Sequence, residues 1–246
     1  MKNFGIVEEK IKETDFFLEQ LTNSKNLSDA RYYLSAFLSA SRSITFVLQA
    51  SISEINGFQK WYEEQQVKLK QNDLAKYFVE ARNLSQHVGY YPITSCVFND
   101  NTVKYTFTYH SEAVDSLFQK VFYDNLAHSI NLDHIHNEVK NPIPKEDVAT
   151  ACKKYFVLLL EIIQDCYQQF GHIIDPVQYF VYGISKVGKS LEDIEEELDY
   201  PRGWTKIESI PEEERIQMLR REFEKAVTID YVFEKYLGTN RLGEKI

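Results

Sequence analysis

The chain is poor in the residues that mark disordered, fibrous or disulfide-stapled proteins. Its 246 residues include only nine Gly and six Pro, too few for long flexible or proline-rich linkers. Cys96, Cys152 and Cys166 are an odd number, and no two of them have the CxxC spacing. A disulfide framework and a cysteine zinc site are therefore not expected. We expect free thiols and a reducing compartment, the cytoplasm.

Long hydrophobic runs are also missing. No stretch approaches the roughly 18 uninterrupted apolar residues of a membrane span. The strongest candidate, YFVLLLEIIQDC, meets Glu161 after six apolar residues. The first ten residues, MKNFGIVEEK, carry acids and no apolar run, so we expect no signal peptide. The sequence predicts neither a membrane span nor a membrane partner.

No part of the chain has a basic excess. The net charge is −9, and residues 1–90 hold 11 Lys and Arg against 11 Asp and Glu. The counts are 6 against 10 over residues 91–173 and 11 against 16 over residues 174–246. A protein that coats nucleic acid needs a basic face. Any contact with a polyanion is therefore confined to a small local site.

Apolar residues recur with helical spacing along most of the chain, which predicts a mainly α protein built as a helical bundle. We expect helices over residues 4–21, 28–52, 57–70, 73–87 and 145–170. Asn26 or Ser28 can cap the second and Asp73 the fourth. Gly89 and Pro92 follow as stop signals.

Residues 93–109 predict a β-hairpin inserted in this bundle. ITSCVF and VKYTFTY are rich in β-branched and aromatic residues, and NDN between them has turn chemistry. Two strands alone are marginally stable, so the hairpin must pack on helices. After a further helix at 111–126, the sequence predicts two domains. They are a bundle with the inserted hairpin over 1–173 and an acidic helical C-terminal extension packed on it over 174–246.

The stretch GISKVGKS at 183–190 matches the phosphate-loop pattern G-x-x-x-x-G-K-[ST]. That loop requires a buried strand before it and a helix N-terminus that receives the phosphates. Here the following helix, LEDIEEEL, would set five acids beside the triphosphate. We interpret Ser190 as a helix cap with Asp193 three residues later, a capping box.

The segment HSINLDHIHNE supplies His128, His134 and His136, with Asp133 and Glu138 among them. It lacks an HExxH pattern and a third ligand at a recognised spacing. We interpret these histidines as surface loop residues, so no metal site is expected.

EARNLSQHVG, residues 80–89, places Arg82, Asn83 and His87 close together. Asn83 and His87 share one face of an α-helix. Arg82 and His87 are five residues apart and point about 140° apart on a straight α-helix. They meet at one phosphate only if the helix ends at His87 or if a second copy supplies one of them.

Asp73, Phe78 and ARNLSQH, after a helix that holds KWYEEQQ, resemble the signature of HEPN-domain proteins over about residues 25–90. The resemblance implies a helical bundle and a metal-independent endoribonuclease of toxin, defence or RNA-processing systems. It assigns phosphate binding to Arg82, orientation of the pair to Asn83, and general acid and base catalysis to His87. It implies no cofactor, single-stranded RNA as substrate, a homodimer and a cognate antitoxin or partner protein. The family's tyrosine two residues after the histidine is absent, because Gly89 stands there.

Two alternatives remain open. The chain could be a non-catalytic helical interaction module that binds its partner through residues 174–246. It could also bind a nucleotide without cleaving it, with Arg82 and His87 as phosphate ligands.

If Arg82 and His87 cleave RNA, the purified protein should cut single-stranded RNA in EDTA and leave 2′,3′-cyclic phosphate ends. DNA should survive, because it has no 2′-hydroxyl nucleophile. His87→Ala should lower the rate about a hundredfold or more, whereas His134→Ala should change it little. Cleavage by the His87→Ala variant, or cleavage that needs added metal, contradicts this chemistry.

Overall fold

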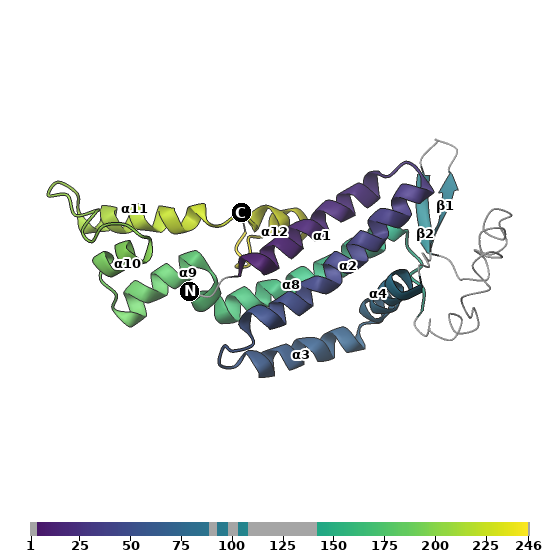
Figure 1. Cartoon of the computed structure of the whole chain (residues 1–246), viewed down its shortest axis with the longest axis horizontal. Coiled ribbons are helices and arrows are strands. Elements are labelled where there is room, and N and C mark those ends of the chain that lie inside the picture. Colours follow the sequence, from purple (N-terminus) through teal and green to yellow (C-terminus); the bar gives the residue numbers. More distant parts are fainter. Residues whose placement is uncertain (1–3, 89–92, 98–102, 108–141, 246) are drawn as a thin grey trace. The chain divides into compact units, whose positions relative to one another are not determined.

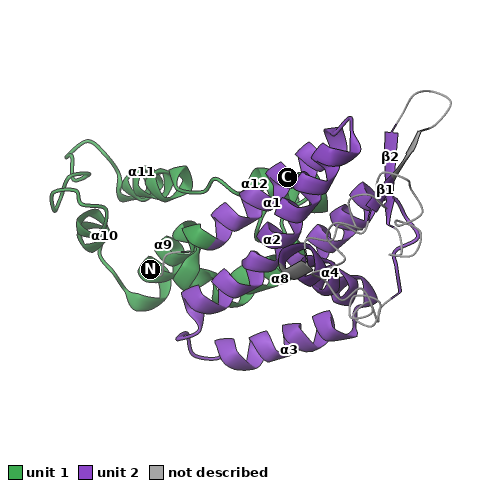
Figure 2. Cartoon of the chain, turned by 45° about the vertical axis from the view of Figure 1, so that its right-hand side comes forward, with its two compact units in different colours: residues 1–6, 160–246 green, residues 7–159 purple. Residues whose placement is uncertain are grey.

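The computed structural model describes residues 4–88, 93–97, 103–107 and 142–245. In these residues the protein is mainly helical with one small antiparallel sheet (Figure 1), which confirms the predicted fold class. Two compact units are present: unit 2 is residues 7–159, and unit 1 is residues 1–6 with 160–246 (Figure 2). The predicted domain boundary at residue 173 is a statement about which parts of the chain fold independently, and it stays a prediction.

The helices expected in the first half and at 145–170 are confirmed. They are α1 (Gly5–Asn23), α2 (Leu27–Ile52), α3 (Phe58–Gln71), α4 (Asp73–Asn83) and α8 (Val148–Ile174). A short π-helix, η1 (Leu84–Val88), follows α4 directly. Both α1 and α8 contribute residues to both units.

Side-chain caps start two of these helices. Asn26 Oδ1 accepts a hydrogen bond from the Asp29 amide of α2 at 2.9 Å. The cap of α4 is Asn72, whose Oδ1 accepts from the Ala75 amide at 2.9 Å. The prediction that Asp73 caps α4 was wrong by one residue. Asp73 is instead the first helical residue, where its carboxylate meets the positive end of the helix dipole.

The core of unit 2 centres on Phe78 of α4. Its ring stacks on Tyr155 of α8, with ring centres 4.5 Å apart and planes at 15°. Phe37 of α2 contacts the Phe78 ring edge to face at 6.1 Å, and Phe107 does so at 6.2 Å. All four rings are buried. Aromatic pairs in these geometries add to the stability that burial alone provides.

The predicted hairpin is present as β1 (Ile93–Val97) and β2 (Val103–Phe107). The strands are antiparallel, with Ile93 opposite Phe107. The Tyr105 hydroxyl lies 3.2 Å from the Ser24 carbonyl and 3.1 Å from the Asn26 carbonyl, to which it donates. This contact attaches β2 to the turn between α1 and α2. The hairpin therefore packs on the helices, as expected.

The segment after residue 174 folds into short helices in unit 1, as predicted. They are α9 (Pro176–Tyr182), the π-helix η2 (Gly183–Val187), α10 (Leu191–Glu197), α11 (Glu212–Lys225) and α12 (Asp230–Leu237). The helices α9, α10 and α11 share a core that contains Phe180, Leu191, Ile194, Leu219 and Phe223.

A buried charge cluster closes unit 1. Asp175 is fully buried and caps α9, accepting from the Gln178 amide at 2.8 Å. Arg241 Nε donates to the same Asp175 carboxylate. The other side of the guanidinium donates through Nη1 to Asp230 Oδ2 at 2.6 Å. Three charged groups thus join the turn after α12 to the first residues of α9 and α12.

Several expected features lie outside the described residues. They are the helix at 111–126, the turn at 99–101 and the loop that holds His128, His134 and His136.

We predict that Arg241→Ala lowers the free energy of unfolding by about 3–5 kcal/mol, because it leaves the Asp175 carboxylate buried without a cation. Urea denaturation followed by circular dichroism measures this loss. Arg220→Ala is the control, since Arg220 pairs with Glu224 at 2.9 Å on the exposed surface. Its loss should stay below about 1 kcal/mol. Equal losses in the two variants would show that the buried cluster contributes no more than a surface ion pair.

Candidate functional site

Arg82 and Asn83 lie together at the end of α4. Arg82 Nη1 donates to Asn83 Oδ1 at 3.3 Å, the contact expected if Asn83 orients the guanidinium. Arg82 is half-buried and Asn83 is exposed. The Arg82 Nε is buried and has no hydrogen-bond partner among the described residues. The structure therefore brings two of the three predicted residues together.

His87 lies in η1, and its side chain is outside the described part of the chain. A π-helix closes hydrogen bonds between residues five apart, so it turns less per residue than the 100° of an α-helix. The 140° separation of Arg82 and His87 assumed a straight α-helix, and that assumption was wrong. Ser85 and Gln86 of η1 contact Ser35 Oγ of α2 at 2.8 and 3.2 Å, which holds the π-turn against α2.

The phosphate-loop pattern at 183–190 is accidental, as we interpreted it. The supposed strand is helix α9, and Gly183–Val187 form η2. Asp193 N donates to Ser190 Oγ at 3.2 Å, and Ser190 N donates to Asp193 Oδ2 at 3.0 Å, which confirms the capping box. Lys189 pairs with Glu197 and donates to Tyr179 Oη at 2.7 Å. The lysine of the pattern is thus already neutralised.

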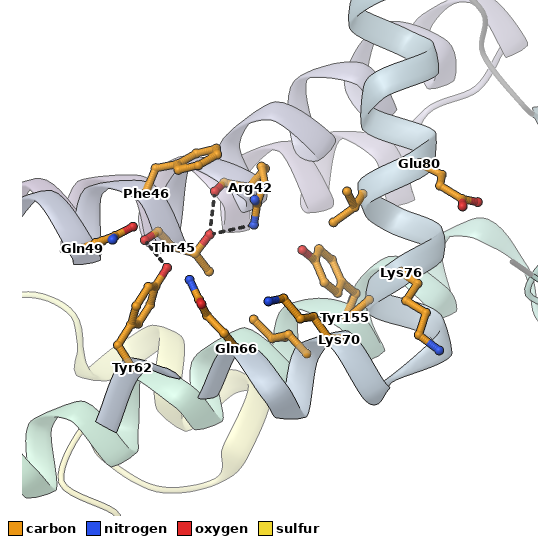
Figure 3. A pocket seen from close by; sticks show the side chains of 13 residues that line it. Arg42, Thr45, Phe46, Gln49, Tyr62, Gln66, Lys70, Lys76, Glu80 and Tyr155 are labelled. Atoms are coloured by element: carbon orange, nitrogen blue, oxygen red, sulfur yellow. Dashed lines mark hydrogen bonds between the residues drawn. The ribbon is translucent and has the colours of Figure 1, made fainter. Parts of the chain in front are cut away.

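Unit 2 contains a pocket that the sequence did not predict. Its volume is about 390 Å³, and it lies between α2, α3 and α4, with Tyr155 of α8 among its lining residues (Figure 3). This volume is in the range of sites that hold small organic molecules.

Four polar side chains point into this pocket in Figure 3: Arg42, Gln66, Lys70 and Tyr155. Among the described residues, the Gln66 amide, the Lys70 ammonium and the Tyr155 hydroxyl have no hydrogen bond or ion pair. Arg42 uses Nη1 to donate to Thr45 Oγ1 at 3.2 Å. These groups therefore keep most of their hydrogen-bonding capacity for a ligand.

The two charged residues at the rim on α4 have their head groups directed away from the centre of the pocket (Figure 3). The Lys76 ammonium pairs with Asp73 at 2.7 Å, and the Glu80 carboxylate points outward. The charge that faces the interior is therefore that of Arg42 and Lys70, and it is positive.

Tyr155 adds a neutral donor to the two cations. Burial raises the pKa of Tyr155 to about 12, although the nearby Arg42 guanidinium opposes this shift. The phenol is therefore protonated at neutral pH, and its O–H can donate to an anion. Two cations and a phenol around one pocket form an arrangement that suits an anionic group.

The rest of the lining is largely apolar and aromatic. Phe46 leaves 52% of its surface exposed, and the Arg42 guanidinium stacks 4.3 Å from its ring centre. The Tyr62 hydroxyl donates to the Thr45 carbonyl at 3.0 Å, and Tyr62 also lines the pocket. The pocket thus combines a cationic part with an aromatic wall.

The sequence does not reveal this pocket, because each of its residues resembles an ordinary helix-surface residue. The only sequence feature that pointed to the pocket was the helical spacing of its residues. Arg42, Phe46 and Gln49 recur on one face of α2, and Gln66 and Lys70 on one face of α3. Spacing alone does not reveal that these two faces meet.

Among the described residues, no three His, Cys, Asp or Glu side chains are grouped so as to hold a metal ion. No helix in the described ranges is both long enough and apolar enough to span a membrane.

Comparison with known proteins gives one similarity. Residues 16–119 match the family model described as "Bacteriophage lambda protein ea47". No curated protein and no solved structure matches the chain.

This match overturns the HEPN resemblance, because the family that covers the segment with Arg82, Asn83 and His87 is not a HEPN family. The physical reason is the low information content of the motif. An arginine, an asparagine and a histidine are ordinary residues for the polar end of a helix. Their spacing also crosses from α4 into a π-turn, so it does not set the geometry that the resemblance assumed.

Proposed function

We propose that the protein is a non-catalytic helical binding module whose pocket between α2, α3 and α4 binds a small organic anion. The observation that carries this proposal is the convergence of Arg42, Lys70, Gln66 and the Tyr155 hydroxyl in one pocket. Arg42 and Gln66 are half-buried and Tyr155 is buried, and donors held there without partners cost free energy, whereas the exposed Lys70 adds positive charge at the pocket mouth. A ligand that supplies acceptors there recovers that cost, which favours an anion over a neutral molecule.

The comparison with known proteins supports a setting for this module. Residues 16–119 include every pocket residue on α2, α3 and α4, so the similarity to a bacteriophage family supports a role in a phage or prophage. The cytoplasm is the compartment that we propose. Cys152 and Cys166 are buried free thiols, and burial raises the pKa of both. Such thiols behave as small apolar side chains and suit a reducing environment.

RNA cleavage by Arg82 and His87 stays a prediction, now without the family resemblance that motivated it. The partnerless Nε of Arg82 among the described residues is compatible with it. A homodimer and a cognate partner protein also stay predictions. The geometric reason for the dimer is weaker, because the 140° separation does not apply across η1.

We predict that phenyl phosphate, which carries both an anion and a ring, binds the full chain with measurable heat in isothermal titration calorimetry. Arg42→Ala and Lys70→Ala should each weaken its binding about tenfold or more, since a hydrogen bond to a charged group contributes about 1.5–3 kcal/mol.

Lys76→Ala is the matched control, because its ammonium pairs with Asp73 and points away from the pocket. It should leave the affinity for phenyl phosphate unchanged. Circular dichroism of each variant checks that the helices remain. Equal affinity in all three variants, or no binding at millimolar concentration, would remove the pocket as an anion site.

A further inference from the structure

The pocket has two chemically different ends. On α2, Arg42 and Gln49 are seven residues apart, which corresponds to about 10 Å along the helix axis. On α3, Tyr62 and Lys70 occupy the two ends of the same face. A turn of five residues joins α2 to α3, and the Tyr62 hydroxyl reaches the Thr45 carbonyl. The helices therefore run antiparallel here, with Arg42 and Lys70 at one end and Gln49 and Tyr62 at the other (Figure 3).

The cationic end suits a phosphate group. A guanidinium presents a planar set of donors that binds two phosphate oxygens at once. Arg42 donates one hydrogen bond within the described residues, to Thr45, so further N–H groups remain for a ligand. The Lys70 ammonium and the Tyr155 hydroxyl add donors on the other sides of the same space (Figure 3). Three side chains from three helices can thus surround one tetrahedral anion.

The opposite end suits a flat ring that carries hydrogen-bonding groups. Tyr62 lines it with aromatic surface, whereas the Phe46 ring lies beside the Arg42 guanidinium, whose carbon is 4.3 Å from the ring centre. The side-chain amides of Gln49 and Gln66 each hold donors and an acceptor. They have no partner among the described residues. Aromatic faces beside amide groups are the means by which proteins bind unpaired nucleobases.

We infer that the ligand of this pocket is a nucleoside monophosphate unit, with its phosphate at Arg42, Lys70 and Tyr155 and its base at Tyr62 and Gln66. This inference rests on the proposed anion-binding function and specifies its ligand. The two ends lie about 10 Å apart along α2, a separation that a phosphate and a base on one ribose can bridge. Inorganic phosphate alone would leave most of the 390 Å³ to water. The unit is either a free mononucleotide or the 5′-terminal nucleotide of an RNA.

Isothermal titration calorimetry of the full chain tests the inference with AMP, GMP, CMP and UMP as probes. Inorganic phosphate and the four nucleosides are the reference ligands. At least one mononucleotide should bind about tenfold more tightly than phosphate and than its own nucleoside, because only it fills both ends. Gln66→Leu should reduce the discrimination among the four bases and weaken mononucleotides more than it weakens inorganic phosphate. Arg42→Ala and Lys70→Gln should weaken mononucleotides and leave nucleosides unchanged.

Lys189→Ala is the matched control, because Lys189 belongs to the phosphate-loop pattern and pairs with Glu197. It should bind mononucleotides as the unmodified chain does. Loss of binding in this variant, with binding retained in Arg42→Ala, would assign the nucleotide to residues 183–190 and overturn the inference.

The remaining outcomes separate this inference from the function on which it rests. If phenyl phosphate binds and no mononucleotide binds more tightly than inorganic phosphate, the anion site stands and the nucleotide inference fails. If no anion binds at all, both fail. A 5′-phosphorylated tetranucleotide that binds more tightly than every mononucleotide supports an RNA end as the source. Weaker or equal binding of that tetranucleotide supports a free nucleotide.

Discussion

The contact between Phe78 and Tyr155 is the constraint on which unit 2 depends. The two stacked rings join α4 to α8, and edge contacts with Phe37 and Phe107 extend the cluster to α2 and β2. The stacked ring fixes the position of Tyr155, and its hydroxyl points into the pocket (Figure 3). The same cluster sets the position of α4, four residues before Arg82. Core packing and both candidate sites therefore share one support.

The cations of the pocket differ from those of unit 1 in how they are paired. In unit 1, cations and acids largely satisfy each other: Arg202 pairs with Asp193 and Glu196, and Arg215 pairs with Glu192. Such groups have little capacity left for an outside ligand. In the pocket of unit 2, Arg42 and Lys70 have no carboxylate partner among the described residues. The acidic net charge of the chain is thus compatible with a local cationic pocket, because charge acts over short, screened distances.

What the sequence predicted well depends on local interactions. Helix positions follow from apolar residues three and four apart, and the capping box follows from Ser190 and Asp193 three residues apart. The hairpin follows from two β-rich runs with a turn between them. Each of these features depends on residues that are close together in sequence, so a single sequence is enough to predict it. The error at Asp73 is of the same kind, since Asn72 and Asp73 are both good caps and only geometry selects one.

The candidate pocket could not be predicted in the same way. Arg42 and Tyr155 are more than a hundred residues apart in sequence, and their approach depends on how α2, α4 and α8 pack. The sequence neighbours of these two residues do not indicate that either of them lines a pocket. The family resemblance was wrong for a related reason. It rested on a short motif, and the spacing of that motif does not set the three-dimensional arrangement of its side chains.

Both of the motif-like segments in this chain include π-helical residues: ARNLSQH ends in η1, and GISKVGKS begins with η2. A π-turn is equivalent to an α-helix with one inserted residue, so the direction of every side chain after it is offset by about 100° from the α-helical count. Deleting a single residue from Leu84–Val88 would restore the α-helical register at the end of α4. Length at this position therefore matters more than residue identity. A homologous chain with one residue fewer in this turn would differ in the geometry of the helix end even if it kept Arg82, Asn83 and His87.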